Sequence, residues 1–300
     1  MIINQSNLSI LYTGFKASFQ AGLTMVEPTW NRIATEVPST TETEKYGWLG
    51  QMPRIREWIG DRVIQNIEAH DYSITNKDFE ITVGVDRNKI EDDRYSMFAP
   101  IFQEMGRSSK AHPDELVYGI LNQGFTVPCY DKQPMFSASH PVINSKGKEV
   151  AVSNYQDGNL QPWFLLSTKR AIKPLIFQNR KKFDFIAKTD PKTSDEVFNT
   201  KTFIYGGDSR SNVGFGFWQM AFASKAALTA ANLQAAYTAM QTLTGDNGRP
   251  LGIQPDLLVV GPANVFPARQ IIKAATLAGG GTNTNFDLVD ILETPWIGIV

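Results

Sequence analysis

Cysteine and histidine, the side chains that most often serve as metal ligands or nucleophiles, are scarce in this sequence. Its 300 residues include one cysteine, Cys129, and three histidines. A single cysteine excludes an intrachain disulfide and a zinc site built from several thiolates, and we expect Cys129 to be a passive thiol. The histidines, His70, His112 and His140, lie far apart and form no H-E-x-x-H motif. The sequence therefore predicts no metal ion and no cofactor.

The signatures of hydrolases and of nucleotide-binding sites are also missing. No G-x-S-x-G nucleophile elbow occurs. The segment GGGTNTN at 279–285 lacks the Gly-Lys-Ser/Thr of a phosphate-binding loop, so we interpret it as a loop tip. A hydrolase that uses a loop serine, Ser137 or Ser139, with His140 stays open as a separate alternative with no motif in its support. The sequence favours a protein that is not an enzyme.

The chain has neither an excess of one charge nor a long apolar run. It carries 29 basic and 30 acidic residues, a formal charge of −1, whereas a nucleic-acid reader normally has a basic face. The apolar stretch FGFWQMAFA at 215–223 is much shorter than the roughly 20 residues that span a bilayer. The first residues lack the pattern of a signal peptide. We therefore expect a soluble protein of the cytoplasm with no membrane partner.

Apolar residues near the start recur at helical spacing. Leu8, Leu11, Phe15 and Phe19 are three and four residues apart, which predicts an amphipathic helix. A polar connector that is rich in Pro, Ser, Thr and Glu follows up to residue 45. We interpret 1–45 as an N-terminal arm whose apolar contact residues dock on the chain's own domain or on a neighbour.

The middle of the chain alternates between strand and helix patterns. Strict alternation over 79–85 predicts a half-buried strand. The pattern over about 89–123 predicts a long helix that Pro100 kinks or restarts, with Pro113 in a helix first turn. After a loop-rich stretch at 127–161, short apolar runs separated by turn signals such as GGDSRSN indicate strands. These runs are 163–166, 174–178, 183–187, 202–206 and 213–223.

The last part predicts a compact α+β subdomain from about 226 to 300. Thr229 can cap a helix that ends before Gly245. A buried strand at 256–260, a helix at 263–279 and a returning strand after the glycine-rich loop complete the unit.

The stretch YGWLGQMPRIREWIG, which opens the hairpin expected over 46–72, concentrates aromatic residues among glycines. Each of its large aromatic side chains can bury about 150–250 Å², which an isolated hairpin cannot shelter. The hairpin therefore either folds back on its own core or lies across another subunit. For the second case we predict eight intersubunit contact residues: Tyr46, Trp48, Leu49, Met52, Arg54, Arg56, Trp58 and Ile59.

Several long and idiosyncratic runs resemble the Mu-like phage major head subunit (gpT) family. They are YGWLGQMPRIREWIGDR, EAHDYSITNKDFEITVGVDRNKIEDD, MFAPIFQEMGRSSKAHPDEL, FTVPCYDKQPMF with SASHPV, KPLIFQNR, GFGFWQMA and LLVVGPAN. They follow the order of the family and run over about 1–297. The resemblance implies an α+β fold of the tailed-phage major capsid type.

The domains that this resemblance implies can be assigned to ranges of the sequence. They are an N-terminal arm at 1–45, an extended loop at 46–72, a peripheral domain at 73–225 with a spine helix at about 89–123, and an axial domain with a return strand at 226–300. The β-rich part at 162–223 resembles peripheral-domain strands that many relatives carry at the C-terminus.

The function that the resemblance implies is that of a major capsid protein. Copies would self-assemble in hexameric and pentameric rings into the icosahedral shell that encloses the double-stranded DNA of a tailed phage or Mu-like prophage. A scaffold protein, a portal and decoration proteins are the expected partners. The expected location is the virion, and the host cytoplasm during assembly. The alternative on the same fold is the shell protein of an encapsulin-like nanocompartment.

Overall fold

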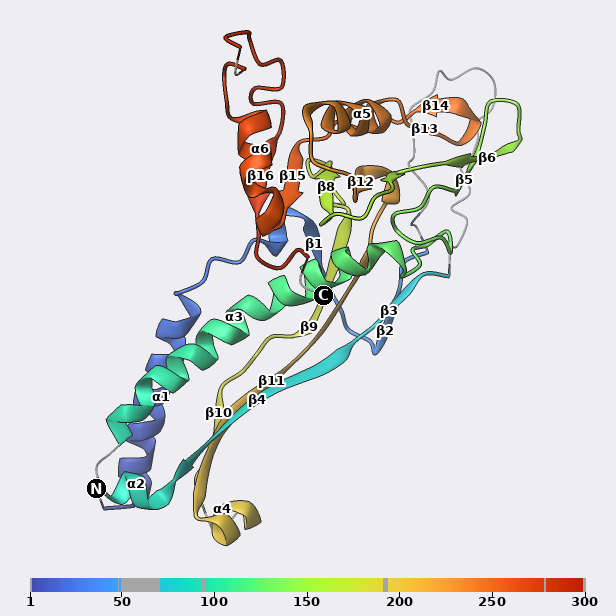
Figure 1. Cartoon of the computed structure of the whole chain (residues 1–300). Coiled ribbons are helices and arrows are strands. Elements are labelled where there is room, and N and C mark those ends of the chain that lie inside the picture. The colour runs from blue at the N-terminus through green and yellow to red at the C-terminus, as the bar shows by residue number, and fades with distance from the viewer. Residues whose placement is uncertain are drawn as a thin grey trace.

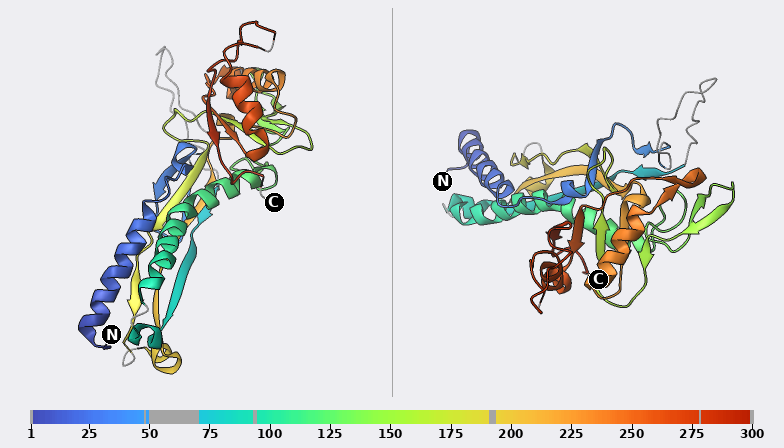
Figure 2. Two further views of the ribbon diagram at one scale, coloured as in Figure 1. Left: turned by 60° about the vertical axis from the view of Figure 1, so that its left-hand side comes forward. Right: turned by 90° about the horizontal axis from the view of Figure 1, so that it is seen from above.

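The computed structural model describes residues 2–47, 49, 71–92, 95–190, 194–277 and 279–298. The molecule is elongated: a long, thin part with two helices against a sheet leads to a broader part with a second sheet (Figure 1). Figure 2 shows the same extended shape from two further sides, with the N-terminus at the tip of the thin part and the C-terminus near the junction of the two parts.

The sheet of the thin part contains strands from both halves of the chain. Its order is β1-β9-β11-β10, and β4 also pairs with β11. The strands are β1 (Ala34–Pro38), β4 (Lys77–Asp86), β9 (Leu175–Lys181), β10 (Ile186–Lys188) and β11 (Thr202–Phe215). The strand predicted at 79–85 is confirmed as part of β4, and its odd-numbered residues are the less exposed ones.

One turn predicted from the sequence is wrong, because the segment lies inside strand β11. The segment GGDSRSN at 206–212, expected as a turn between two strands, lies inside this single strand of 14 residues. Its glycines are needed for close packing instead, because a Cβ on Gly207 would lie 1.9 Å from the carbonyl oxygen of Asp184. The strand absorbs the irregularity as a shift of register between Arg210 and Ser211.

The long helix predicted over 89–123 is broken as expected, but it is arranged differently around its prolines. A short helix α2 (Arg87–Glu91) and a 3-10 turn (Tyr95–Phe98) precede α3 (Ala99–Asn122), and Pro100 lies in the first turn of α3. Pro113, expected in a helix first turn, lies inside α3. A proline removes one backbone donor, and buried residues on both sides of it, such as Met105 and Val117, hold the helix in place.

Helix α1 (Gln5–Leu23) packs along α3 with almost no space between the two backbones. A Cβ on Gly22 would lie 1.9 Å from the carbonyl oxygen of Gln103, and a Cβ on Gly106 would lie 2.1 Å from that of Phe19. Glycine at both positions allows this approach. The first helix is therefore part of the thin layer and covers the sheet together with α3 (Figure 1).

The broader part contains a second five-stranded sheet of order β16-β15-β8-β12-β7. Its strands are β7 (Tyr155–Gln156), β8 (Trp163–Leu166), β12 (Ala221–Ser224), β15 (Leu257–Val260) and β16 (Asp290–Glu293). Helices α5 (Ala230–Gln241) and α6 (Val265–Ile272) accompany it (Figure 1). Thr229 caps α5 as predicted, by accepting a hydrogen bond from the N–H of Asn232. The predicted helix at 263–279 ends earlier, at Ile272.

This second sheet joins the last part of the chain to earlier segments. Strand β15 pairs with β8 as well as with β16, so the expected boundary at 226 would cut through one sheet. The strands β7, β8 and β12 are buried or half-buried here. The unit therefore consists of about 155–166 and 221–224 together with the C-terminal residues.

Shorter elements lie outside the two five-stranded sheets. They are α4 (Asp195–Thr200) and the antiparallel ribbons β2 (Thr43–Lys45) with β3 (Ser73–Thr75), β5 (His140–Ile143) with β6 (Glu149–Val152), and β13 (Thr244–Gly245) with β14 (Arg249–Pro250). The stretch 127–161, expected as loop, thus contains β5, β6 and β7. Within the part of the chain that the structure describes, no helix has both the length and the apolarity that crossing a bilayer requires.

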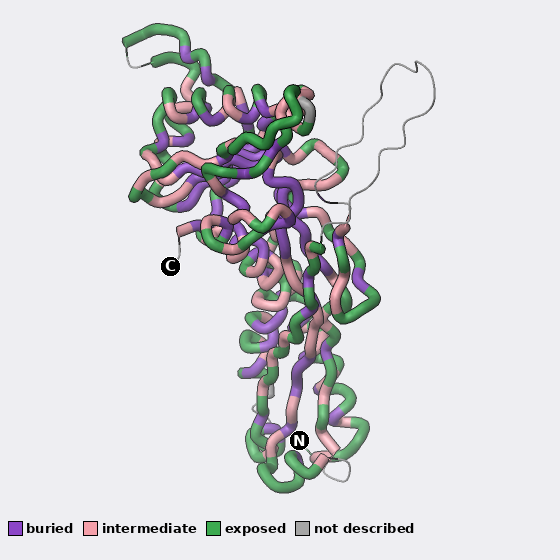
Figure 3. Tube along the Cα trace, turned by 90° about the vertical axis from the view of Figure 1, so that its right-hand side faces the viewer, coloured by how far each residue is buried: buried purple, intermediate pink, exposed green. Residues whose placement is uncertain are grey.

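The described residues form two hydrophobic cores. The larger contains the second sheet, the C-terminal end of α3 and buried residues of β1 and β9 from the first sheet. The smaller lies between α1, α3 and the strands β4 and β11. Figure 3 shows the buried residues concentrated in the broader part and thinning out along the narrow one.

Replacing Gly106 with alanine should lower the stability of the subunit by about 1–3 kcal/mol, because the added methyl group would overlap the backbone of α1. Gly14→Ala in α1 is the matched control: nothing lies within 4 Å of its added Cβ. That substitution should raise stability by up to about 1 kcal/mol, since alanine favours helix more than glycine does. Urea unfolding of the unassembled subunit measures both, and equal effects would contradict the close helix contact.

Candidate assembly surfaces and a buried polar site

The four apolar residues of the predicted arm lie inside their own chain. Leu8, Leu11, Phe15 and Phe19 are all buried in the smaller core. The ring of Phe15 stacks on that of Phe102 in α3, with 4.3 Å between centroids, and meets Tyr205 of β11 edge-on. Of the two docking modes left open by the sequence, the structure shows the one on the chain's own domain.

Two of the eight residues predicted as intersubunit contacts are also buried in the chain's own core. Tyr46 is 3% exposed and Leu49 is fully buried. This differs from the expectation, because their side chains have their packing partners within the same molecule. The other six (Trp48, Met52, Arg54, Arg56, Trp58 and Ile59) lie outside the described residues.

A buried polar network holds both ends of the segment 46–72 against the first sheet. The hydroxyl of Tyr46 donates to Oε1 of Gln178 at 2.8 Å, and Nε2 of Gln178 donates to the carbonyl oxygen of Ile74 and to Oδ1 of Asn76. Burial raises the pKa of Tyr46 above its usual range. Burial also raises the pKa of Tyr72 to about 12, although its hydroxyl accepts a hydrogen bond from the N–H of Phe215. Both tyrosines are therefore neutral side chains that act through hydrogen bonds.

Glu44 closes the turn that precedes this segment. Its carboxylate accepts hydrogen bonds from the backbone N–H groups of Thr40 and Thr41 and from the hydroxyl of Ser39. These bonds, first of all those from the backbone of Thr40 and Thr41, lower the pKa of Glu44 to about 2. The turn therefore keeps its negative charge and its shape across the physiological pH range.

Three helices of the described chain each carry a large apolar side chain that is more than 60% exposed. Ile10 on α1 is 66% exposed, Phe198 on α4 is 72% exposed and Phe266 on α6 is 77% exposed. The helices α4 and α6 lie at opposite ends of the molecule (Figure 1). Sequence patterns did not single out these residues, because a local pattern does not tell which apolar side chain lacks a partner in the folded chain.

The two histidines among the described residues, His112 and His140, both contact side chains of the surrounding fold. His112 packs edge-on against the ring of Phe79, with 4.4 Å between centroids, and its Nδ1 lies 3.6 Å from Glu115. It lines an apolar groove of about 570 Å³ between the helices and the first sheet. His70 lies outside the described residues. His140, at the start of β5, is fully buried and lies in a polar network.

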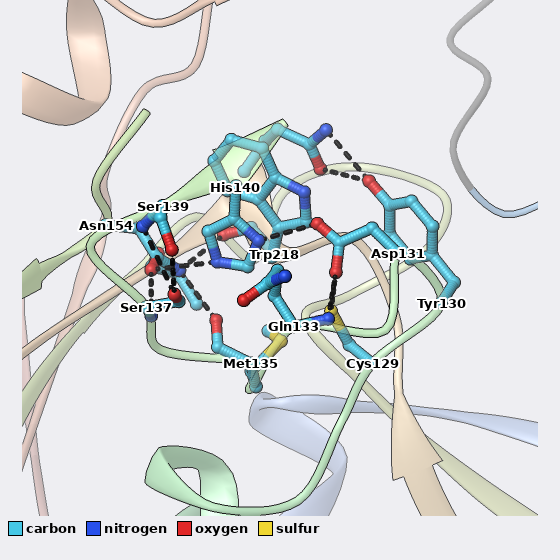
Figure 4. A network of polar contacts seen from close by, with 12 residues as sticks. Cys129, Tyr130, Asp131, Gln133, Met135, Ser137, Ser139, His140, Asn154 and Trp218 are labelled. Atoms are coloured by element: carbon cyan, nitrogen blue, oxygen red, sulfur yellow. Dashed lines mark hydrogen bonds and ion pairs between the residues drawn. The ribbon is translucent and has the colours of Figure 1, made fainter. Parts of the chain in front are cut away.

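This network joins the loop after α3 to the second sheet (Figure 4). Asp131 accepts hydrogen bonds from Nδ1 of His140 at 2.6 Å and from the thiol of Cys129 at 3.1 Å. The other ring nitrogen of His140 lies 3.2 Å from Oδ1 of Asn154, and its ring stacks on Trp218 at 4.0 Å with an interplanar angle of 5°.

The arrangement does not provide a catalytic serine or an activated thiol. The hydroxyl of Ser137 contacts that of Ser139 at 3.4 Å, whereas both nitrogens of His140 are engaged with Asp131 and Asn154. Burial raises the pKa of the Cys129 thiol far above its usual range, so it stays protonated and unreactive. The serine and His140 alternative thus has no geometric support.

Cys129, Asp131 and His140 are also the one set of three metal-ligating side chains found among the described residues, with ligand atoms within 4.8 Å of one another. Burial acts to raise the pKa of Asp131, but hydrogen bonds from His140 and Cys129 outweigh it, and the net direction is downward. Each of the three side chains therefore has a hydrogen-bond partner within the trio.

Comparison with known proteins gives matches along nearly the whole chain. The model of the family described as "Mu-like prophage major head subunit gpT" matches residues 8–297. The chain is 42% identical over 299 residues to the major capsid protein of Escherichia phage Mu, with 98% of each chain covered.

Solved structures agree with these sequence matches. A chain in the procapsid of bacteriophage JBD30 superposes with a TM-score of 0.85 at 44% identity, covering 98% of this chain and 100% of that one. A chain in the JBD30 capsid decorated with minor capsid protein trimers gives a TM-score of 0.78 at 34% identity, covering 93% and 94%.

Replacing Tyr46 with phenylalanine should lower the stability of the subunit by about 1–3 kcal/mol, because Oε1 of the buried Gln178 would lose its donor. Tyr155→Phe is the matched control, since the bond from its hydroxyl to Asp157 is exposed and its loss should cost within about 0.5 kcal/mol. Chemical unfolding of both variants tests the difference. A Tyr46→Phe protein as stable as the control would show that the network does not hold the segment.

Proposed function

The chain belongs to the Mu-like prophage major head subunit (gpT) family and is a major capsid protein of the tailed-phage type, and from this we propose that its copies form the hexameric and pentameric rings of an icosahedral shell around double-stranded DNA. The observation that carries the proposal is the match over 98% of the chain to a subunit of a solved procapsid. The family is one of structural capsid proteins, and we infer no catalytic role. The comparisons favour the phage head over a nanocompartment.

We further propose how the parts of the chain are used in the shell. The first sheet with α1 and α3 serves as the peripheral domain, and α3 as its spine helix. The second sheet with α5 and α6 serves as the axial domain, with β7, β8 and β12 included because they belong to the same sheet. The exposed Phe266 and Phe198, on opposite ends of the molecule, then suit contacts with different neighbours.

The segment 46–72 is the proposed extended loop. Its ends are fixed: β2 pairs with β3, and Tyr46 and Leu49 are buried in the chain's own core. We therefore restrict the proposed intersubunit contacts to Trp48, Met52, Arg54, Arg56, Trp58 and Ile59. Tryptophans are frequent anchors of interfaces, and arginines of the rim fix register. A loop with a rigid base can hold such anchors in place over a neighbour.

Partners and location follow from the same proposal. The JBD30 capsid is decorated with minor capsid protein trimers, and a decoration protein is a reasonable partner for this shell as well. A scaffold protein and a portal would assist assembly in the host cytoplasm, and the finished protein would reside in the virion. The near balance of 29 basic and 30 acidic residues suits a container wall, because a strongly basic wall would hold the DNA backbone and hinder its release.

Expression of the full chain, alone and together with the scaffold protein of its own phage, tests the proposed function. Electron microscopy should show closed shells in at least the second sample. A protein that stays a monomer under both conditions and at high concentration would contradict self-assembly.

Trp48→Ala with Trp58→Ala should leave a folded, soluble subunit that no longer forms shells, because two large apolar anchors are lost from each intersubunit contact. Trp48→Phe with Trp58→Phe is the control; it retains most of the aromatic area and should still assemble. Circular dichroism reports the fold and negative-stain microscopy reports the shells. Intact shells of the double alanine variant would refute the anchor role.

A further inference from the structure

The side-chain amide of Asn154 has an orientation that its surroundings fix. Its Nδ2 donates to the carbonyl oxygens of Met135, Trp218 and Ala221, at 2.8, 3.3 and 3.2 Å. Its Oδ1 accepts from the backbone N–H of Ser137 at 3.0 Å. A flipped amide would place its oxygen against three carbonyl oxygens and its NH₂ group against an N–H. The oxygen of Asn154 must therefore face His140 (Figure 4).

Both ring nitrogens of His140 consequently face oxygen acceptors. Nε2 lies 3.2 Å from Oδ1 of Asn154, which has no proton to give, and Nδ1 lies 2.6 Å from Oδ2 of Asp131. A neutral imidazole has one N–H donor and one lone pair, so one of its nitrogens would here point a lone pair at an oxygen. We propose that His140 is a buried imidazolium that clamps the loop 129–137 and the start of β5 to the second sheet, and that this clamp loosens as pH rises.

The surroundings stabilise such a charge. The carboxylate of Asp131 supplies the opposite charge and is itself held by the thiol of Cys129 and by the N–H of Gln133. Because the pKa of Asp131 lies below its ordinary value, the proton between the two groups belongs to the ring. The parallel indole of Trp218, 4.0 Å away, adds a cation–π contact. A charge paired and hydrogen-bonded in this way can remain in the core.

The same protonation would make Cys129, Asp131 and His140 a poor site for a cation. An imidazolium has no lone pair for a cation, and the Cys129 thiol keeps the proton that it donates to Asp131.

The sign of the pH dependence follows from proton counting. In the unfolded chain a histidine loses its second proton near about pH 6.5, whereas the native clamp retains it. Above that pH the unfolded state binds fewer protons, so stability falls as pH rises. The slope that this one group contributes cannot exceed one proton. The titratable groups around the ring are Asp131 and Cys129 in direct contact with the network, Tyr130, which bonds Gln219, and Asp246, which holds Ile143 of β5.

Nitrogen NMR of the unassembled subunit, labelled with ¹⁵N-histidine, tests the proposal directly. The variant with His70→Gln and His112→Gln retains His140 as its one histidine. At about pH 7.5, where an ordinary histidine is mostly neutral, both nitrogens of His140 should show the chemical shifts of protonated nitrogen. One unprotonated nitrogen would overturn the proposal. If that variant does not fold, the wild-type protein decides equally well: one of its three rings should be doubly protonated, and none would be the contrary result.

Two stability measurements separate the clamp from other roles of the network. The unfolding free energy of the wild type and of His112→Gln should fall as pH rises above about 7. His140→Gln should lose this part of the fall, and an unchanged pH dependence in that variant would contradict the clamp. Equimolar Zn²⁺ should leave the melting temperature of the wild type unchanged. A rise that disappears in Cys129→Ser would instead assign a metal site to these residues and overturn the imidazolium.

Discussion

The close contact between α1 and α3 is the constraint on which the thin part of the molecule depends. With Gly22 and Gly106 at the crossing, the two helices form a layer flat enough for the aromatic rings of both to reach the sheet. Phe15, Phe102 and Tyr205 then share one small core. A larger residue at either glycine would push the two helices apart and weaken their cover over this narrow core.

A thin part of this kind has a large surface for its volume and buries few residues completely. It cannot gain much stability from its own interior, so contacts with further copies are its natural source of additional burial. The elongated shape, the apolar side chains that stay exposed at both ends and the near neutral charge all agree with a subunit whose lowest free energy is reached in a shell. The elongated shape of the fold therefore favours capsid assembly, independently of any particular contact.

Local patterns predicted those elements whose signals are local. The spacing from Leu8 to Phe19 correctly indicated the first helix and its buried face, the alternation at 79–85 indicated β4, and Thr229 indicated the start of α5. The segment 206–212 was misread, because glycines that permit close packing look the same in sequence as glycines that permit turns.

Features that join distant segments could not be predicted in this way. The second sheet combines strands about 100 residues apart, between β8 and β15, and the oxygen that faces His140 belongs to Asn154, an asparagine with no recognisable motif. Tyr46 and Leu49 were assigned with their aromatic neighbours, although only the folded chain shows that Gln178 and the core already satisfy them. The family resemblance supplied the fold and the function that such patterns alone could not.

The polar site around Asp131 shows why a cluster of reactive residue types need not be an enzyme site. A catalytic group needs a free lone pair or an ionisable proton that a substrate can reach. Here the thiol of Cys129 donates inward, Asp131 accepts three hydrogen bonds, and Asn154 bonds three carbonyl groups and the backbone of Ser137. Such saturation makes each partner costly to remove and fixes one arrangement of the loop. A shell subunit requires one defined arrangement, because an error in one loop would be repeated in every copy of the shell.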